Sequence, residues 1–264
     1  MEYLQIVLAI LSGALVGFTL GLIGGGGSII ATPLLLYVVG LQPHVAIGTG
    51  AFAVSLNAFF NFGSHARAGN VKWRSAILFG IFGIAGAAMG SSLGKTFDGH
   101  RLLFLFAIVM VVVGVLILRR GSRLDTGGES RELRLTPGAL GKIAVAALLV
   151  GMLSGFFGIG GGFLIVPGLL FSTGMPMIFA VGSSLLSVGS FGLTTAINYA
   201  ASGLVDWWVA AEYIAGGIAG GLLGMHLSNR LAKRKAALNR VFAGFVFVVA
   251  AYMLYRNFGA IMIS

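Results

Sequence analysis

The strongest constraint in this sequence is that one unit occurs twice. Residues 17–93 align without a gap with residues 151–227, so that residue i of the first copy corresponds to residue i+134 of the second. The identities are mostly glycines, which determine the backbone geometry that a chain can adopt. They include the pairs Gly21/Gly155, Gly24/Gly158, Gly26/Gly160, Gly27/Gly161, Pro33/Pro167, Gly40/Gly174, Gly48/Gly182, Gly69/Gly203, Trp73/Trp207, Gly83/Gly217, Gly86/Gly220 and Gly90/Gly224. In an apolar chain, a duplication that keeps shape is typical of a transporter built from two repeats around one central site.

Composition places the chain in a membrane. Of its 264 residues, 58% are hydrophobic and 9% are charged, whereas soluble domains have about 25% charged residues. Apolar runs separated by short polar or glycine-rich breaks cover 4–23, 28–39, 44–62, 71–93, 102–118, 138–157, 162–173, 177–198, 207–227 and 238–256. Most approach the roughly 20 residues that a membrane-spanning helix needs, and none alternates like the strands of a membrane barrel. We expect an all-helical integral membrane protein with about ten membrane segments.

Basic residues decide between two topologies. Segments 28–39 and 162–173 are short, so each half has five crossings if they cross the membrane and four if they turn back. Five crossings put 14 Lys and Arg on one side and 3 on the other, whereas four give 10 and 7. Because basic residues gather on the cytoplasmic side, we expect five. An odd number inverts the second repeat relative to the first, and the short segments then become half-helices whose ends lie inside the membrane.

The expected organisation is a first repeat at 1–118, a cytoplasmic linker at 119–137 and a second repeat at 138–264, with five membrane segments in each repeat. The net charge of +10 is explained by cytoplasmic loops that contact anionic lipid. The basic clusters are short and lack interleaved aromatic residues, so nucleic acid is not an expected partner. Cysteine is absent and the four histidines are well separated, so we expect neither a metal site nor a cofactor.

Two glycine clusters at equivalent positions are the best candidates for a binding site. Missing side chains leave backbone N–H groups accessible, and a helix N-terminus adds a partial positive charge, so each cluster suits an anion. The alternative is that these glycines only allow tight helix packing. The cluster residues predicted to bind substrate are Gly24, Gly25, Gly26, Gly27 and Ser28 in the first repeat, and Gly158, Gly160, Gly161 and Gly162 in the second.

Polar residues inside the following apolar segments are further candidates. Thr49 corresponds to Ser183, which is followed by Ser184, and one helix carries Ser55, Asn57 and Asn61 where its counterpart carries Ser187, Ser190 and Thr195. Polar side chains in hydrocarbon need partners, from another helix or from a substrate. We predict substrate contact for Thr49, Asn57, Ser183 and Ser184. The alternative for the hydroxyls is a bond to the carbonyl one turn earlier in their own helix.

These motifs resemble those of the TauE/SafE family of sulfite and sulfonate exporters. The resemblance spans roughly residues 8–255 and rests on the paired glycine clusters with a downstream proline, the segments Gly48-Thr49-Gly50 and Gly182-Ser183-Ser184, and the elements Gly69-Val71-Trp73 and Gly203-Val205-Trp207. It implies transport of small sulfur-containing anions, such as sulfite or sulfoacetate, in a bacterial plasma membrane.

Among the ionisable residues, Glu212 lies six residues into segment 207–227 and corresponds to Leu78 in the first repeat. It is either a proton-coupling residue or an interfacial acid that reaches water. His44, His65, His100 and His226 lie at or near segment ends, where we expect interfacial positions.

We therefore expect a multi-pass plasma-membrane carrier, surrounded by lipid, that moves a small anion by alternating access at a midplane site. A different class of protein, an anion channel with a continuous pore, remains the alternative. An enzyme is not expected, because the chain has no cysteine and no catalytic spacing of His, Asp and Glu.

Overall fold

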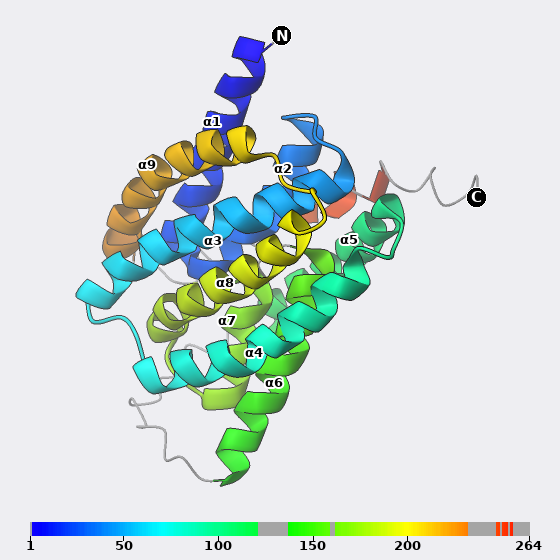
Figure 1. Ribbon diagram of the computed structural model, residues 1–264. Helices are drawn as coiled ribbons and strands as arrows, with labels where there is room; N and C mark the ends of the chain where they lie inside the picture. The colour runs from blue at the N-terminus through cyan, green and yellow to red at the C-terminus, as the bar shows by residue number, and fades with distance from the viewer. Residues whose placement is uncertain are drawn as a thin grey trace.

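In the computed structural model the protein is a bundle of helices (Figure 1). The structure describes residues 2–120, 137–158, 162–231, 247–248, 250–252 and 254–255, and these contain no strand. The elements are α1 (Glu2–Ile23), the 3-10 helix η1 (Gly24–Ile30), α2 (Ala31–Tyr37), α3 (Pro43–Arg67), α4 (Trp73–Gly94), α5 (Gly99–Arg120), α6 (Pro137–Phe157), α7 (Gly162–Thr173), α8 (Met177–Ala200) and α9 (Trp207–Leu231).

The helices match the segments expected from the apolar runs. Every predicted segment from 4–23 to 207–227 overlaps one of these elements, while 238–256 and the linker 119–137 lie largely outside the described residues. Within the described part, six helices are long and apolar enough to cross a membrane. The chain is therefore an all-helical, multi-pass membrane protein.

Duplicated glycines end the helices. All glycines with positive φ in the described residues form three repeat-matched pairs, which are Gly24/Gly158, Gly40/Gly174 and Gly69/Gly203. Each pair has φ values between 65° and 87°, a conformation that residues with a Cβ rarely adopt. The pairs follow α1 and α6, α2 and α7, and α3 and α8. The glycines kept in both copies thus encode where equivalent helices stop.

The first short segment differs from the expected open break. Residues 24–30 form one 3-10 helix that leads into the seven-residue α2, and Pro33 lies in the first turn of α2, where no backbone N–H is needed. Its counterpart α7 is one helix that contains Pro167. The four glycines of the first repeat therefore wind into a tight helix, because a short 3-10 turn satisfies backbone groups that an open loop would leave unpaired inside the protein.

Packing pairs the two halves element by element. Helix α1 lies against α9, α4 lies against α6, and α3 lies against α8, while η1 contacts α7. Glycines make the first two contacts close: Gly17 meets the backbone of Gly217, and Gly151 meets the backbone of Gly83. These two contacts are the same contact with the repeats exchanged, because 17 and 83 correspond to 151 and 217.

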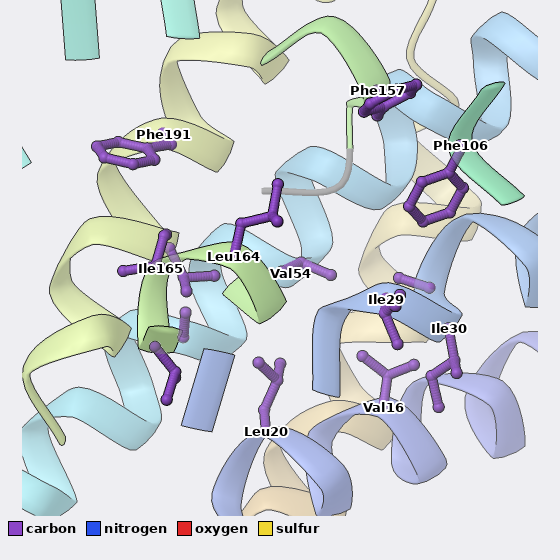
Figure 2. Packing of buried hydrophobic residues seen from close by; sticks show 14 of the residues in the cluster. Val16, Leu20, Ile29, Ile30, Val54, Phe106, Phe157, Leu164, Ile165 and Phe191 are labelled. Atoms are coloured by element: carbon purple, nitrogen blue, oxygen red, sulfur yellow. The ribbon is translucent and has the colours of Figure 1, made fainter. Parts of the chain in front are cut away.

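The core is apolar and draws on both halves. Figure 2 shows side chains from α1 and η1, including Val16, Leu20 and Ile29, close to Leu164 and Ile165 of α7. Large apolar side chains elsewhere face outward, with exposed fractions of 60% for Leu11, Ile81 and Val145. An apolar core inside an apolar surface fits a protein whose surroundings are lipid.

Candidate functional site

The two glycine clusters meet inside the protein. The hydroxyl of Ser28 in η1 accepts a hydrogen bond from the backbone N–H of Gly162, with 3.2 Å between Oγ and N. Gly162 is the first residue of α7, and the two residues are 134 positions apart, so they are equivalent in the two repeats. Gly25, Gly26 and Gly27 belong to the same 3-10 helix, whereas Gly160 and Gly161 lie outside the described residues. The contact joins one cluster to the other.

The first glycine of each cluster packs on the opposite repeat. Gly24, with φ +72°, lies against Val181 of α8, and Gly158, with φ +65°, lies against Ile47 of α3. Val181 and Ile47 are themselves equivalent residues, each one position before the second predicted motif. The first glycine of each cluster therefore packs next to the hydroxyl-containing motif of the other half.

Thr49 and Ser183 bind the opposite repeat and not their own helices. Thr49 Oγ1 accepts a hydrogen bond from the backbone N–H of Asp206, and Ser183 Oγ accepts one from the backbone N–H of Lys72, each at 2.9 Å. These bonds are equivalent under exchange of the repeats and connect α3 and α8 to the loops before α9 and α4. Each hydroxyl retains its own proton to donate. Ser184 differs, because its hydroxyl donates to Val181 O at 2.8 Å within its own helix.

Asn57 faces α9 rather than the glycine clusters. Its side chain is fully buried against Gly217, and neither its amide nitrogen nor its amide oxygen has a hydrogen-bond partner among the described residues. In the other half the equivalent residue is Phe191, which packs on Gly83 and stacks on Phe79 with 6.4 Å between ring centroids. A polar position in one half thus corresponds to an apolar one in the other.

Sequence reasoning missed the full extent of this polar region. Asn57, Asn61 and His65 follow one another at intervals of four residues and are all buried on α3, and we call them the polar seam. His65 lies in the last turn of α3, as expected of a residue near a segment end, but its side chain has 0% exposure and faces the protein interior. The spacing i, i+4, i+8 on one face of a helix was the signal that could have revealed the seam.

A second polar contact lies at the central crossing of α3 and α8. Ser55 Oγ donates to the carbonyl oxygen of Gly189 at 2.7 Å, and these two residues are again 134 positions apart. Ser28 and Ser55 therefore both bond to their own equivalents in the second repeat, where each equivalent is a glycine.

Glu212 lies in the second turn of α9 and its side chain is half-buried. Asp206 caps the same helix, since its Oδ1 accepts hydrogen bonds from the N–H groups of Trp208 and Val209, both at 3.1 Å. Trp207 and Trp208 are 57% and 82% exposed, as expected of an interfacial aromatic belt. Glu212 is thus close to the end of its helix and separate from the Ser28–Gly162 contact.

At each end of α4, a lysine side chain contacts one end of α8. The ammonium of Lys95, after α4, donates to Asn198 O, Asn198 Oδ1 and Ser202 Oγ at 3.1, 2.7 and 2.9 Å. At the other end, Lys72 Nζ lies 4.5 Å from the centre of the Phe179 ring, at the start of α8. Among the described residues no group of three or more His, Asp or Glu is close enough to hold a metal ion.

Comparison with known proteins identifies relatives over nearly the whole chain. The model of the family described as sulfite exporter TauE/SafE matches residues 9–253. A probable membrane transporter protein of Xylella fastidiosa strain Temecula1 is 53% identical over 260 residues, which are 98% of both chains. The probable membrane transporter protein YdhB of Bacillus subtilis is 26% identical over 227 residues, which are 86% of this chain and 92% of that protein. No solved structure matches the chain. The resemblance seen in the sequence motifs is confirmed.

Proposed function

Because the chain belongs to the TauE/SafE family of sulfite exporters, we propose that this membrane transporter carries a small sulfur oxyanion or an organosulfonate by alternating access. The names of the family and of the relatives describe transporters, not enzymes. The site we propose is at the midplane between the two repeats, and the membrane is the plasma membrane of a bacterium.

The observation that carries the proposal is the hydrogen bond between Ser28 and Gly162. A helix N-terminus presents unpaired N–H groups and a partial positive charge, and the first residue of α7 directs its N–H at the Ser28 hydroxyl. An anionic oxygen can take the place of that hydroxyl without leaving a buried donor unpaired. The site therefore offers dipoles to a weakly hydrated anion, which can bind and still leave.

Exchanged contacts support an inverted arrangement of the repeats around this site. The bonds Thr49–Asp206 and Ser183–Lys72 form a pair in which residue i contacts j+134 and j contacts i+134. Such reciprocal contacts are typical of an interface with two-fold symmetry. A contact between a residue and its own equivalent lies on the pseudo-two-fold axis that relates the repeats. Ser28–Gly162 is a contact of the second kind, so the proposed site is where the two halves meet.

Loop contacts support five membrane segments per half. With four segments per half, the loops 94–101 and 199–206 would lie on opposite sides of the membrane. Lys95 nevertheless bonds to Asn198 and Ser202, which fits five segments, with both loops on one side. The contact of Lys72 with Phe179 is likewise on one side under that arrangement. We propose that the Lys95 side is external and that the more basic side, with loops 63–71 and 119–137, is cytoplasmic.

Burial favours a carrier over a channel. Ser28, Thr49 and Ser183 all have 0% exposure in this conformation, so a substrate can reach them only when helices move. Gly24 to Ser28, Gly158, Gly160 to Gly162, Thr49, Asn57, Ser183 and Ser184 remain the proposed substrate residues. Glu212, near the external end of α9, remains the proposed residue for proton coupling from that side.

Transport by purified protein in liposomes tests this function. Preloaded unlabelled sulfoacetate should accelerate entry of labelled sulfoacetate, because a carrier returns faster when loaded. A pore would show no such trans-stimulation. A thermal-shift screen of sulfite, thiosulfate, sulfoacetate, taurine, sulfate and simple carboxylates identifies the substrate, since only a ligand of the folded state raises the midpoint. Stabilisation by carboxylates alone would refute the sulfur-anion assignment.

Topology is tested with single cysteines, because the chain has none. Cysteines at Ser64 and Ser122 should be protected from an impermeant thiol reagent in intact cells, and a cysteine at Ser202 should be labelled. Labelling of position 122 with protection of position 202 would overturn the proposed orientation.

A further inference from the structure

His65 connects the polar seam to the first glycine cluster. Its Nε2 lies 3.4 Å from the carbonyl oxygen of Gly21. A carbonyl oxygen only accepts hydrogen bonds, so Nε2 must carry the proton in this contact. The other ring nitrogen, Nδ1, is buried and has no hydrogen-bond partner among the described residues. Nδ1 is therefore the atom at which a further proton can bind.

The bonded carbonyl belongs to the helix end that leads into the proposed site. Gly21 is in the last turn of α1, three residues before Gly24 and the start of η1. The last four carbonyls of an α-helix lack regular partners and carry the negative end of the helix dipole. A charged imidazole would bind such a carbonyl more strongly than a neutral one. Protonation of His65 would thus strengthen its hydrogen bond to the end of α1, the position at which η1, the helix that contains Ser28, begins.

The second repeat has no equivalent of this contact. The residue that corresponds to His65 is Tyr199, whose ring stacks on His44 with 6.5 Å between centroids. The residue that corresponds to Gly21 is Gly155, and its carbonyl accepts a hydrogen bond from the backbone N–H of Gly158 at 3.1 Å. At the first cluster, the imidazole of His65 contacts the carbonyl oxygen at the end of α1. At the second cluster, the equivalent carbonyl oxygen accepts a hydrogen bond from a backbone N–H.

The polar seam continues from His65 along α3. Asn61 Nδ2 donates to the carbonyl oxygen of Asn57 at 2.9 Å, and both side chains lie against glycines of α9, with Asn57 on Gly217 and Asn61 on Gly221. One turn before Gly217, the hydroxyl of Tyr213 is buried and also without a partner among the described residues. Several groups able to donate or accept hydrogen bonds thus lie along one helix interface, next to the imidazole of His65.

Resting on the proposed anion-transport function, we propose that His65 is a proton-binding residue that positions the first glycine cluster and couples proton uptake to anion binding. The neutral imidazole, with its proton on Nε2, takes up one proton at Nδ1 and becomes an imidazolium. The added positive charge favours the anion at the cluster, and loss of the same proton from Nδ1 favours its release. His65 acts through Gly21 and the course of η1, without contact to the substrate.

Several elements that pack against α3 carry other ionisable residues. Most of these residues lie near the end of α3 opposite to His65 or outside the polar seam. Gly21 packs on α9, since a Cβ added to it would meet Gly221 and Met225 as well as Asn61 of α3. The ionisable residues of α9 that follow this contact are His226, which is exposed, and Arg230 in the last turn. On α3 itself, Arg67 is two residues away and exposed. The remaining ones are Glu2 and Tyr3 of α1, Tyr37 of α2, His44 of α3, His100, Arg101, Arg119 and Arg120 of α5, Tyr199 of α8, and Glu212 and Tyr213 of α9.

Two matched variants test the coupling. His65→Gln keeps an amide N–H for the Gly21 carbonyl but binds no proton near neutral pH. His44→Gln is the control, because His44 Nε2 makes the same kind of bond to a carbonyl, that of Phe97 at 3.1 Å, at the other end of the same helix. The probe is sulfoacetate in proteoliposomes between about pH 5.5 and 8.5, a range in which the carboxylate of sulfoacetate stays ionised and histidine titrates.

We expect His65→Gln to exchange sulfoacetate between equal pools at a rate that no longer changes with pH, and to lose the acceleration of net uptake by an imposed pH gradient. His44→Gln should keep both. A purely structural role for His65 would lower both activities together. Wild-type sensitivity to the pH gradient in His65→Gln would overturn the proposal.

A measurement that needs no transport keeps the two proposals distinguishable. Nitrogen NMR of the wild-type protein labelled at histidine should show Nδ1 of His65 change from unprotonated to protonated over the same pH range. The signal is assigned by its loss in His65→Gln or, if that variant does not fold, by elimination using variants of the other three histidines. One protonation state throughout the range refutes the role of His65. Absence of exchange for every anion tested refutes the transport function instead.

Discussion

Replacing Gly86 by alanine tests whether the duplicated glycines of α4 and α9 are spacers for helix packing. A Cβ at Gly86 would press on the carbonyl oxygen of Leu148 in α6 and lie 2.8 Å from the nitrogen of Met152. On the same helix, a Cβ at Gly80 would meet nothing within 4 Å. Gly80→Ala is therefore a matched control that changes helix propensity without changing the packing.

The size of the effect follows from the contact distances. Ordinary contact for a Cβ begins at 3.4 Å, so α4 and α6 must separate by at least about half an ångström near Met152. Overpacking of this kind costs about 1–3 kcal/mol, whereas glycine to alanine in a helix otherwise contributes up to about 1 kcal/mol of stability. We expect Gly86→Ala to be about 1–3 kcal/mol less stable than Gly80→Ala, because both variants gain the same helix propensity and only Gly86→Ala is overpacked.

Exchange of the repeats supplies a second, independent site for the same test. Gly220 of α9 meets the carbonyl of Ala14 in α1, just as Gly86 meets that of Leu148, since 14 and 86 correspond to 148 and 220. Gly220→Ala should therefore lose about as much stability as Gly86→Ala. An effect at only one of the two positions would contradict the equivalence of the two helix contacts.

The assay is the fraction of protein that remains monodisperse in detergent after heating for a fixed time. For a chain of this size, about 1 kcal/mol shifts the midpoint by roughly 2–4 °C, so Gly86→Ala should melt at least about 2 °C below Gly80→Ala. A midpoint for Gly86→Ala at or above that of Gly80→Ala would refute the packing argument. Normal stability combined with lost transport would instead assign Gly86 to the site.

Three further perturbations have defined outcomes. Thr49→Val and Ser183→Ala each leave a partly buried backbone N–H without its hydroxyl partner, so each should lower stability by about 1 kcal/mol in the same heating assay. A change in only one of them would contradict their equivalence. Lys95→Met removes three hydrogen bonds between the end of α4 and the end of α8, so a cysteine at Ser202 should react faster with a thiol reagent, and an unchanged rate would show that Lys95 does not hold these two helix ends together. Glu212→Gln should keep anion exchange but lose sensitivity to external pH, and a wild-type pH response would make Glu212 an interfacial acid.

Backbone shape was predictable from the sequence because glycine reports directly on φ. The pairs Gly40/Gly174 and Gly69/Gly203 follow helices at equivalent places, as the repeat implied. The state of the first cluster was less predictable, because four glycines in a row fit an open loop and a 3-10 helix equally well by composition. Packing of η1 against α7 inside the protein, where unpaired backbone groups are costly, explains why the structure has the helix.

The hydrogen-bond partners of the polar side chains could not be predicted from the residues next to them in the sequence. The bond from the Asp206 N–H to Thr49 joins residues 157 positions apart, and nothing in the helix around Thr49 indicates it. Once the offset of 134 is known, however, that bond implies the one between Lys72 and Ser183. An internal repeat therefore turns one tertiary contact into two, although it cannot supply the first.

The same offset also exposes what the two halves do not share. Ser28 and Ser55 bond to glycines at their own equivalent positions, so each central contact takes a hydroxyl from the first repeat and backbone from the second. Asn57 and His65 have Phe191 and Tyr199 as equivalents, so the buried amide of Asn57 and the buried Nδ1 of His65, which lack partners among the described residues, both belong to the first half. Inverted repeats by themselves make the inward-facing and outward-facing forms alike. In the proposed carrier, the symmetric glycines would preserve the exchange of conformations, while an imidazole buried in the first half with no counterpart in the second would give the two forms different affinities for protons, which directional transport requires.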